Sequence, residues 1–415
     1  MNKFLTEYFD KKGYLLFCPK SHNFGGFHES LLWALKIKKY KNYKIIINFP
    51  LISTHGHYKT FFKKNYGKKI ILNYLNTLSF REIILSLMLT LLGNILILIV
   101  KLKFLFLFNL IFKKKFDKFK FPFLGFGLRQ IEEFDTYSKI EINNILETNI
   151  NLGSKKVIQN NTVSFCVKDN NYSLYKDISA FASADINNYK KSIIYLINNG
   201  YKISRVGENS MTSIDFKHSQ FRDFSRSKKH FEYLHQEIKN SDFYFGTGAS
   251  HSLIPDLYDK NKVITNNIDF IQSSVSNTYK NFGIYKKIFC LKQKKILSLE
   301  EIFFDGNLFF LKIDELVKAK KIILLDNNPE EILSVVKDFL QKKNHSHKIS
   351  NLLYEFEELK RKAINYHKRK NIKSFYISMY ENSKISIPDD YLNSYLYNSN
   401  QLNEISQKFK IINNL

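Results

Sequence analysis

The chain has 415 residues, of which 44% are hydrophobic, and 64 basic against 38 acidic side chains give it a formal net charge of +26. This length exceeds what one hydrophobic core usually holds, so we expect two domains and an appendage. The three cysteines are far apart and odd in number, which argues against a disulfide framework or a cysteine zinc site. Charges interrupt the short apolar run at the N-terminus, so we expect no secretory signal and a cytoplasmic location.

The positive charge indicates a polyanionic partner, such as nucleic acid, an anionic membrane face or a phosphorylated substrate. A lysine- and asparagine-rich composition is also typical of proteins from AT-rich genomes, which is an alternative origin of the same excess. The basic residues are spread over the whole chain, so nucleic acid is the weakest of these expectations.

Residues 1–150 begin with the pattern of an α/β unit. We expect strands at 14–19, 43–50 and 69–75, and a helix at 27–40. Between the first strand and the helix lies the loop SHNFGG. Its Gly25 and Gly26 let the backbone approach a substrate, with His22 beside them. The residues expected to act in catalysis are His28 and Glu29, since a general base near neutral pH favours histidine. The alternative for each histidine is a structural role.

The most hydrophobic segment covers residues 83–112 and leads into lysines and phenylalanines up to residue 120. Residues 83–100 carry no charge, a length at the lower limit for a membrane span. We interpret 83–120 as a helical insert that contacts the inner face of an anionic membrane, with a buried core helix as the alternative.

Residues 151–345 show a second alternation of strands and helices, and residues 346–415 form a helical tail. Strands are expected at TVSFCVKD, YKISRVG, DFYFGTG, KVITNN and IILLD, with helices between them. Short strands that alternate with helices predict a parallel sheet covered by helices.

Three loops follow strands of this second domain. GTGASHS offers Thr247, Gly248, Ser250 and His251; VGENS brings Arg205, Gly207 and Glu208; and the first strand leads to Asp169. Ligands bind beyond the carboxyl ends of strands in such sheets, so we expect these loops to converge on an anionic ligand. Arg222 and Arg226 lie near Asp223 and could hold a diphosphate or simply form ion pairs. A glycine turn needed only for folding is the alternative reading of GTGASHS.

Several motifs follow one another along this part of the chain: VSFCVKDNNY, INNYKKSIIYLINNGYKISRVGE, HSQFRDFSRS, DFYFGTGASHSLIPDLYDKNKVITNN and LLDNNPEEI. Their order resembles that of a family of putative bacterial glycosyltransferases of surface-polysaccharide loci. The resemblance covers roughly residues 160–340 of this chain. It implies an α/β fold with two Rossmann-like domains in a GT-B-like arrangement, with the acceptor on the first domain and the nucleotide-sugar donor on the second.

The resemblance also implies roles for single residues. Thr247, Gly248, Ser250 and His251 would hold the donor diphosphate, while Arg205, Gly207 and Glu208 would line the nucleotide. No bound cofactor or metal is expected, because helix N-termini and cationic side chains can stabilise a leaving diphosphate. The expected partners are a nucleotide sugar and a glycan or lipid-linked acceptor. A non-catalytic protein of the same fold that binds sugar nucleotides or polyanions is the alternative.

Overall fold

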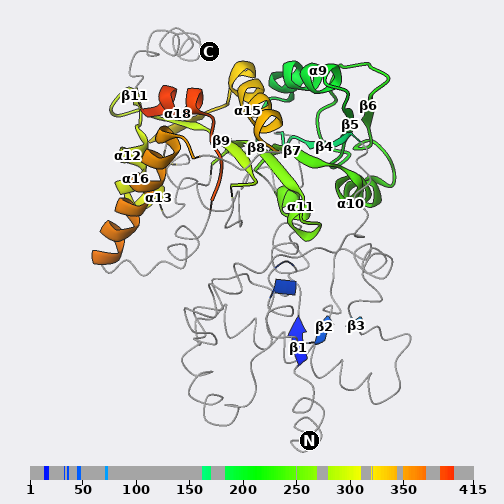
Figure 1. Cartoon of the computed structure of the whole chain (residues 1–415), viewed down its shortest axis with the longest axis horizontal. Coiled ribbons are helices and arrows are strands. Elements are labelled where there is room, and N and C mark those ends of the chain that lie inside the picture. Colours follow the sequence, from blue (N-terminus) through cyan, green and yellow to red (C-terminus); the bar gives the residue numbers. More distant parts are fainter. Residues whose placement is uncertain are drawn as a thin grey trace, which may run out of the picture. The chain divides into compact units, whose positions relative to one another are not determined.

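A computed structural model gives the structure of the chain, which divides into two compact units, Met1–Asn151 and Leu152–Leu415 (Figure 1). The residues that the structure describes are 161–169, 183–248, 250–268, 279–309, 319, 321–343, 349–370 and 384–396, preceded by 14–17, 32, 35–36, 44–47 and 71–72. The segment 83–120 and the loop SHNFGG therefore lie outside the described residues.

The first unit contains three parallel strands in the order β1-β2-β3. They are β1 (Tyr14–Phe17), β2 (Lys44–Ile47) and β3 (Ile71–Leu72). All three expected strands are present, although each is shorter than its apolar run. Leu32 and Leu35 are helical and buried, as expected for the helix between the first two strands. Parallel neighbours need a crossover connection, so this unit begins as an α/β structure.

The second unit is built on a six-stranded, wholly parallel sheet in the order β6-β5-β4-β7-β8-β9. Its strands are β4 (Thr162–Cys166), β5 (Lys202–Arg205), β6 (Phe221–Asp223), β7 (Phe243–Thr247), β8 (Asn261–Asn267) and β9 (Phe282–Tyr285). Numbered along the chain, this is the 3-2-1-4-5-6 order of a Rossmann-like sheet. The direction of winding reverses between β4 and β7.

Helices cover both faces of this sheet (Figure 1). One face carries η2 (Ile186–Tyr189), α9 (Lys190–Asn198) and α15 (Pro329–Lys342); the other carries α10 (His230–Asn240), η3 (Ser250–Leu253) and α11 (Ile254–Leu257). Burial on both sides explains why the central strands read as continuous apolar runs. The rings of Phe165, Tyr189 and Phe245 pack together under η2 and α9, with centroids 5.4–5.6 Å apart.

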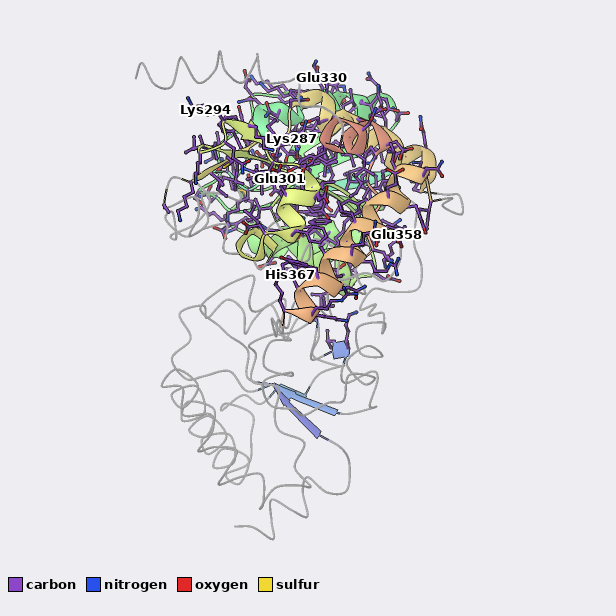
Figure 2. The ribbon with its side chains drawn as sticks, turned by 90° about the vertical axis from the view of Figure 1, so that its left-hand side faces the viewer. Lys287, Lys294, Glu301, Glu330, Glu358 and His367 are labelled. Atoms are coloured by element: carbon purple, nitrogen blue, oxygen red, sulfur yellow. The ribbon has the colours of Figure 1, made fainter. Side chains whose placement is uncertain are left out.

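A small antiparallel sheet follows, in the order β11-β10-β12. Its strands are β10 (Lys287–Cys290), β11 (Lys295–Ile296) and β12 (Ile322–Leu325). The accompanying helices are α12 (Leu299–Phe304), α13 (Gly306–Phe309), α16 (Asn351–Arg369) and α18 (Asp389–Leu396). Near the end of α16, the His367 Nε2 lies 2.8 Å from the Phe303 carbonyl oxygen of α12, which fixes the helix against its neighbour (Figure 2).

The segment expected as a helical tail contains α16 and α18, and both helices belong to the second unit. The Tyr391 hydroxyl of α18 donates to the carbonyl of Tyr285 at the end of β9. Within the described parts of the chain, no helix combines the length and the apolar character needed to cross a bilayer.

Candidate functional site

The carboxyl ends of β4 and β7 lie side by side at the point where the strand order reverses. Cys166 pairs with Gly246 in the parallel register. Just beyond, the backbone N–H of Lys168 donates to the Thr247 Oγ1 at 2.9 Å. Open α/β sheets bind their ligands at this kind of position, outside the carboxyl edge at the switch point. The sheet topology therefore puts the start of GTGASHS where a ligand site is expected.

Gly246 is required by the close approach of these two strands. It has a φ of +157°, and a Cβ at this position would lie 1.8 Å from the carbonyl oxygen of Cys166. Gly248, just after the strand, is crowded from the other side: its Cβ would lie 2.5 Å from the Oδ1 of Asn267. The first glycine has a folding role that needs no ligand, and the second brings the loop against the end of β8.

The loop after β5 is held at the same edge by Arg205. This guanidinium is fully buried and pairs with Asp223 of β6 at 2.8 Å. It also donates to the carbonyl oxygen of Thr212, while the N–H of Thr212 donates to the Asp169 carboxylate at 2.5 Å. Arg205 and Asp169 thus hold the carbonyl and the N–H of the same loop residue, Thr212.

Two further contacts hold the same loop. Arg226 donates to the carbonyls of Asn209, at 3.1 Å, and Met211, at 2.8 Å. Gly207 has a φ of +146°, and a Cβ at this position would lie only 2.3 Å from the Met211 sulfur. Glu208 is half-buried on this loop, and its charge acts on Cys166 at the end of β4 and on Lys168 just after it. The loop consequently carries a carboxylate to the end of the central strand.

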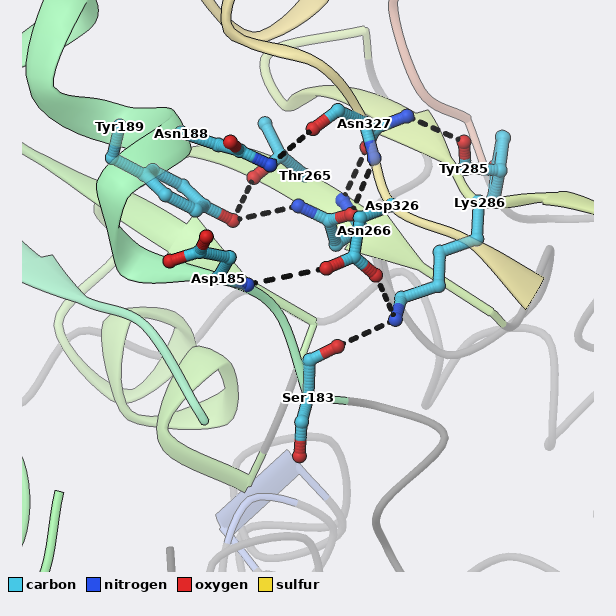
Figure 3. A network of polar contacts seen from close by, with 10 residues as sticks. All are labelled: Ser183, Asp185, Asn188, Tyr189, Thr265, Asn266, Tyr285, Lys286, Asp326 and Asn327. Atoms are coloured by element: carbon cyan, nitrogen blue, oxygen red, sulfur yellow. Dashed lines mark hydrogen bonds and ion pairs between the residues drawn. The ribbon is translucent and has the colours of Figure 1, made fainter. Parts of the chain in front are cut away.

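A polar network that the sequence analysis missed ties the far end of this edge together (Figure 3). The Asn266 N–H donates to the Asn327 Oδ1 at 2.6 Å, and the Asn327 N–H donates back to the Asn266 Oδ1 at 2.7 Å. The Asn266 amide also donates to the Tyr189 hydroxyl at 2.9 Å, which lies 2.7 Å from the Thr265 hydroxyl. Asn266 adopts a left-handed φ of +51°, a conformation that asparagine tolerates better than most residues.

Two buried lysines border the network. Lys286, which follows β9, donates to the Ser183 carbonyl and pairs with Asp326 at 2.6 Å. Lys168 follows β4, and its carbonyl accepts from the Ala184 N–H at 2.8 Å. The segment from Ser183 to Ala184 therefore contacts both. The only signs of this network in the sequence were the turn residues after β12 and the lysine after β4. Neither shows which side chains they contact.

The structure brings several predicted site residues to one edge: Asp169, Arg205, Gly207, Glu208, Thr247 and Gly248. The side chains of Arg205 and Thr247 are fully buried, and each is bonded within the protein. His251 is also fully buried, in η3. Arg222 lies on β6 with an exposed side chain, in a segment for which the sequence analysis had assigned no strand.

The predicted catalytic and acceptor residues lie outside the described part of the chain: His22, Gly25, Gly26, His28 and Glu29. The side chain of Ser250 is likewise not described. Within the described ranges, no group of three or more histidine, cysteine or carboxylate side chains is placed to bind a metal ion. Burial raises the pKa of the Cys166 thiol to about 12, so this group stays neutral behind the site.

No family model and no curated protein matches the chain. A similar solved structure is the dodecameric iron-containing heptosyltransferase TibC in complex with ADP-D-beta-D-heptose, at a TM-score of 0.32 and 10% sequence identity. The alignment covers 63% of this chain and 60% of that enzyme, so the chain spans less than two thirds of its length. At this TM-score the likeness carries no argument, and the fold assignment depends on the strand order.

Proposed function

We propose that the chain is a glycosyltransferase that moves a sugar from a nucleotide-sugar donor to a glycan or lipid-linked acceptor. The observation that carries the proposal is the position of GTGASHS, which follows β7 at the switch point of a 3-2-1-4-5-6 sheet. The motif order from residue 160 to 340 supports the choice of glycosyl transfer over other reactions of nucleotide-binding folds.

The groups at this edge match the chemistry of such a donor. Glu208 is a half-buried carboxylate on the loop after β5, and carboxylates accept hydrogen bonds from ribose or sugar hydroxyls. Gly248 lies at the start of GTGASHS, where its lack of a side chain lets the loop pack against Asn267 at the end of β8. Cations and backbone N–H groups at this edge would stabilise the diphosphate as it leaves, a task that needs no metal ion.

In this proposal the first unit binds the acceptor in a GT-B-like arrangement, with His28 or Glu29 as the general base. Gly25, Gly26 and His22 would line the acceptor. The reaction would belong to bacterial surface-polysaccharide synthesis in the cytoplasm, with the segment 83–120 resting on the inner membrane face.

Titration of the full chain with UDP-, GDP-, CMP- and ADP-sugars tests the donor assignment. We expect one nucleotide class to bind, and to release its nucleoside phosphate when a suitable acceptor is added. Absence of binding to every nucleotide sugar would contradict the proposal. Binding without nucleotide release across a panel of glycan and lipid-linked acceptors would favour the non-catalytic alternative.

A further inference from the structure

The outer edge of the six-stranded sheet carries a strip of exposed basic side chains. β6 is the last strand on that side, and no described strand pairs with its outer edge (Figure 1). The basic strip, residues 216–229, runs from the loop before β6, along β6 and into the turn before α10. Its cations are all exposed: Lys217, Arg222, Arg226, Lys228 and Lys229. Arg222, considered from the sequence as a diphosphate ligand, is therefore part of this strip.

Carboxylates leave most of this charge unbalanced. Asp223 is the only acidic residue among residues 216–229. One of its oxygens accepts from the buried Arg205 guanidinium at 2.8 Å, and the other accepts from the Ser225 hydroxyl at 2.6 Å. Arg226 donates to backbone carbonyl oxygens, which do not cancel its charge. Within the described ranges, Arg222 and the three lysines of the strip form no ion pair.

The local fold does not explain why these cations lie together. Lys228 and Lys229 precede α10, and Lys229 is its N-cap without a capping hydrogen bond from its side chain. The helix dipole disfavours cations at this end of a helix. Asp215 before the strip and Glu232 in the first turn of α10 place one carboxylate at each end, against five cations between them. Such an excess of positive charge fits an anionic surface.

Aromatic side chains among the cations indicate which anionic partner fits. Phe216 and Phe221 are half-buried, and their rings form an edge-to-face pair with centroids 5.2 Å apart. Phe216 also stacks on His218 at 6.3 Å. A nucleic-acid base would need a free ring face, whereas these rings pack on each other and on the histidine. Half-exposed apolar rings beside lysine and arginine are instead the combination that binds the headgroup region of a bilayer.

We infer that the basic strip docks the second unit on an anionic phospholipid bilayer. Side chains of an edge strand alternate between the two faces of the sheet, so the plane that reaches the whole strip lies across the edge of the sheet. The inference goes beyond the proposed function and does not depend on it, because a membrane-binding edge would serve any reaction of this unit. The strip is also separate from the segment 83–120.

Co-sedimentation of the full chain with vesicles tests the inference. Vesicles of phosphatidylglycerol mixed with phosphatidylcholine are compared with vesicles of phosphatidylcholine alone. Each lysine or arginine near an anionic bilayer strengthens binding about fivefold, so Arg222→Gln combined with Lys228→Gln should weaken binding to the anionic vesicles about 25-fold. Binding of the unmodified chain should also weaken as the salt concentration rises.

A double variant on α16 is the matched control. Lys362→Gln combined with Arg369→Gln removes the same charge from exposed positions of a helix on the other side of the second unit (Figure 1). We expect this control to bind the anionic vesicles like the unmodified chain. Thermal unfolding of both double variants should match that of the unmodified chain, because all four side chains are exposed.

Three results would overturn the inference. The first is an unmodified chain that does not prefer the anionic vesicles. The second is an equal loss in the two double variants, because the net charge of the chain would then attract the bilayer. The third is a strip variant that binds vesicles normally but loses binding to a single-stranded oligonucleotide, which would assign the strip to nucleic acid. None of these measurements uses a nucleotide sugar, so the docking surface and the proposed function can each fail alone.

Discussion

Gly246 shows at the residue scale why a glycine motif can be needed both for folding and for a binding site. The Cβ of an alanine would lie 1.8 Å from the Cys166 carbonyl oxygen, which is backbone and cannot move aside. We expect Gly246→Ala to lower the free energy of unfolding by about 3 kcal/mol or more.

Gly200 is the matched control for that substitution. It ends α9 at φ +83°, with nothing within 4 Å of a built Cβ, so Gly200→Ala should cost only about 1 kcal/mol of backbone strain. Urea unfolding of both variants measures the difference. Equal costs would show that β4 and β7 are not as close as the structure has them.

Lys168 predicts a particular dependence of stability on pH. Its pKa falls from 10.5 to about 8 in the folded chain, so between these values the unfolded state binds the additional proton. The contribution of Lys168 to the free energy of unfolding is therefore lowest below pH 8 and rises as the pH increases to 10.5. We expect Lys168→Met to be more stable than the unmodified chain at pH 7, with the advantage shrinking through this window.

Guanidinium unfolding at several pH values measures that difference directly. Lys202→Met serves as the control, because its side chain is exposed. A difference between K168M and the unmodified chain that stays constant from pH 7 to 10.5 would rule out a depressed pKa at this position.

The sequence located much of the candidate edge at residue level but not the partners of its side chains. Thr247, Gly248 and Asp169 could be placed because glycine, hydroxyl and carboxylate residues followed apolar runs. Arg205 was expected to face a ligand, yet it is buried against Asp223. That pairing depends on the register between β5 and β6, which no local pattern of the sequence contains.

At the scale of elements, the pair of Asn266 and Asn327 joins β8 to the turn before α15 (Figure 3). Asn327 is 1% exposed, and its side chain accepts from the Asn266 N–H and donates to the Tyr285 carbonyl at 2.9 Å. Asn327→Ala would leave a buried N–H without its acceptor, so we expect a loss of about 2–3 kcal/mol.

Asn328 offers a control one residue away. It is an exposed N-cap, and its side chain accepts from the Glu331 N–H at 2.9 Å in a capping box. Asn328→Ala should cost only about 1 kcal/mol. If denaturant unfolding gave N327A the smaller loss of the two, the asparagine pair would not be what holds β8 to α15.

The elements that the sequence predicted share one property. β4, β5, β7 and β8 are apolar runs bounded by turn residues, and α9, α10, α15 and α16 have helical periodicity. Four strands were missed. β6 contains Arg222 and Asp223, and β11 has two residues, so both lack these signals, whereas β9 and β10 are short apolar runs that the sequence analysis did not assign. Their backbone pairing depends on neighbours distant in sequence, so local patterns cannot reveal them.

At the scale of the whole molecule, alternation of strands and helices predicted a parallel sheet but not its order. The 3-2-1-4-5-6 arrangement depends on which strand each crossover returns to, and it determines that β4 and β7 meet at the switch point. The position of the candidate site therefore became clear only with the topology. The two-domain GT-B-like arrangement and the membrane contact of 83–120 stay predictions from the sequence.

Hydrogen exchange of the full chain, with and without a saturating nucleoside diphosphate, tests the central claim most directly. The claim is that the donor binds at the carboxyl ends of β4 and β7. We expect slower exchange in residues 167–169, 206–212 and 250–253, with α16 unchanged as the internal reference. Binding that slows exchange elsewhere while these three segments keep their rates would contradict the account.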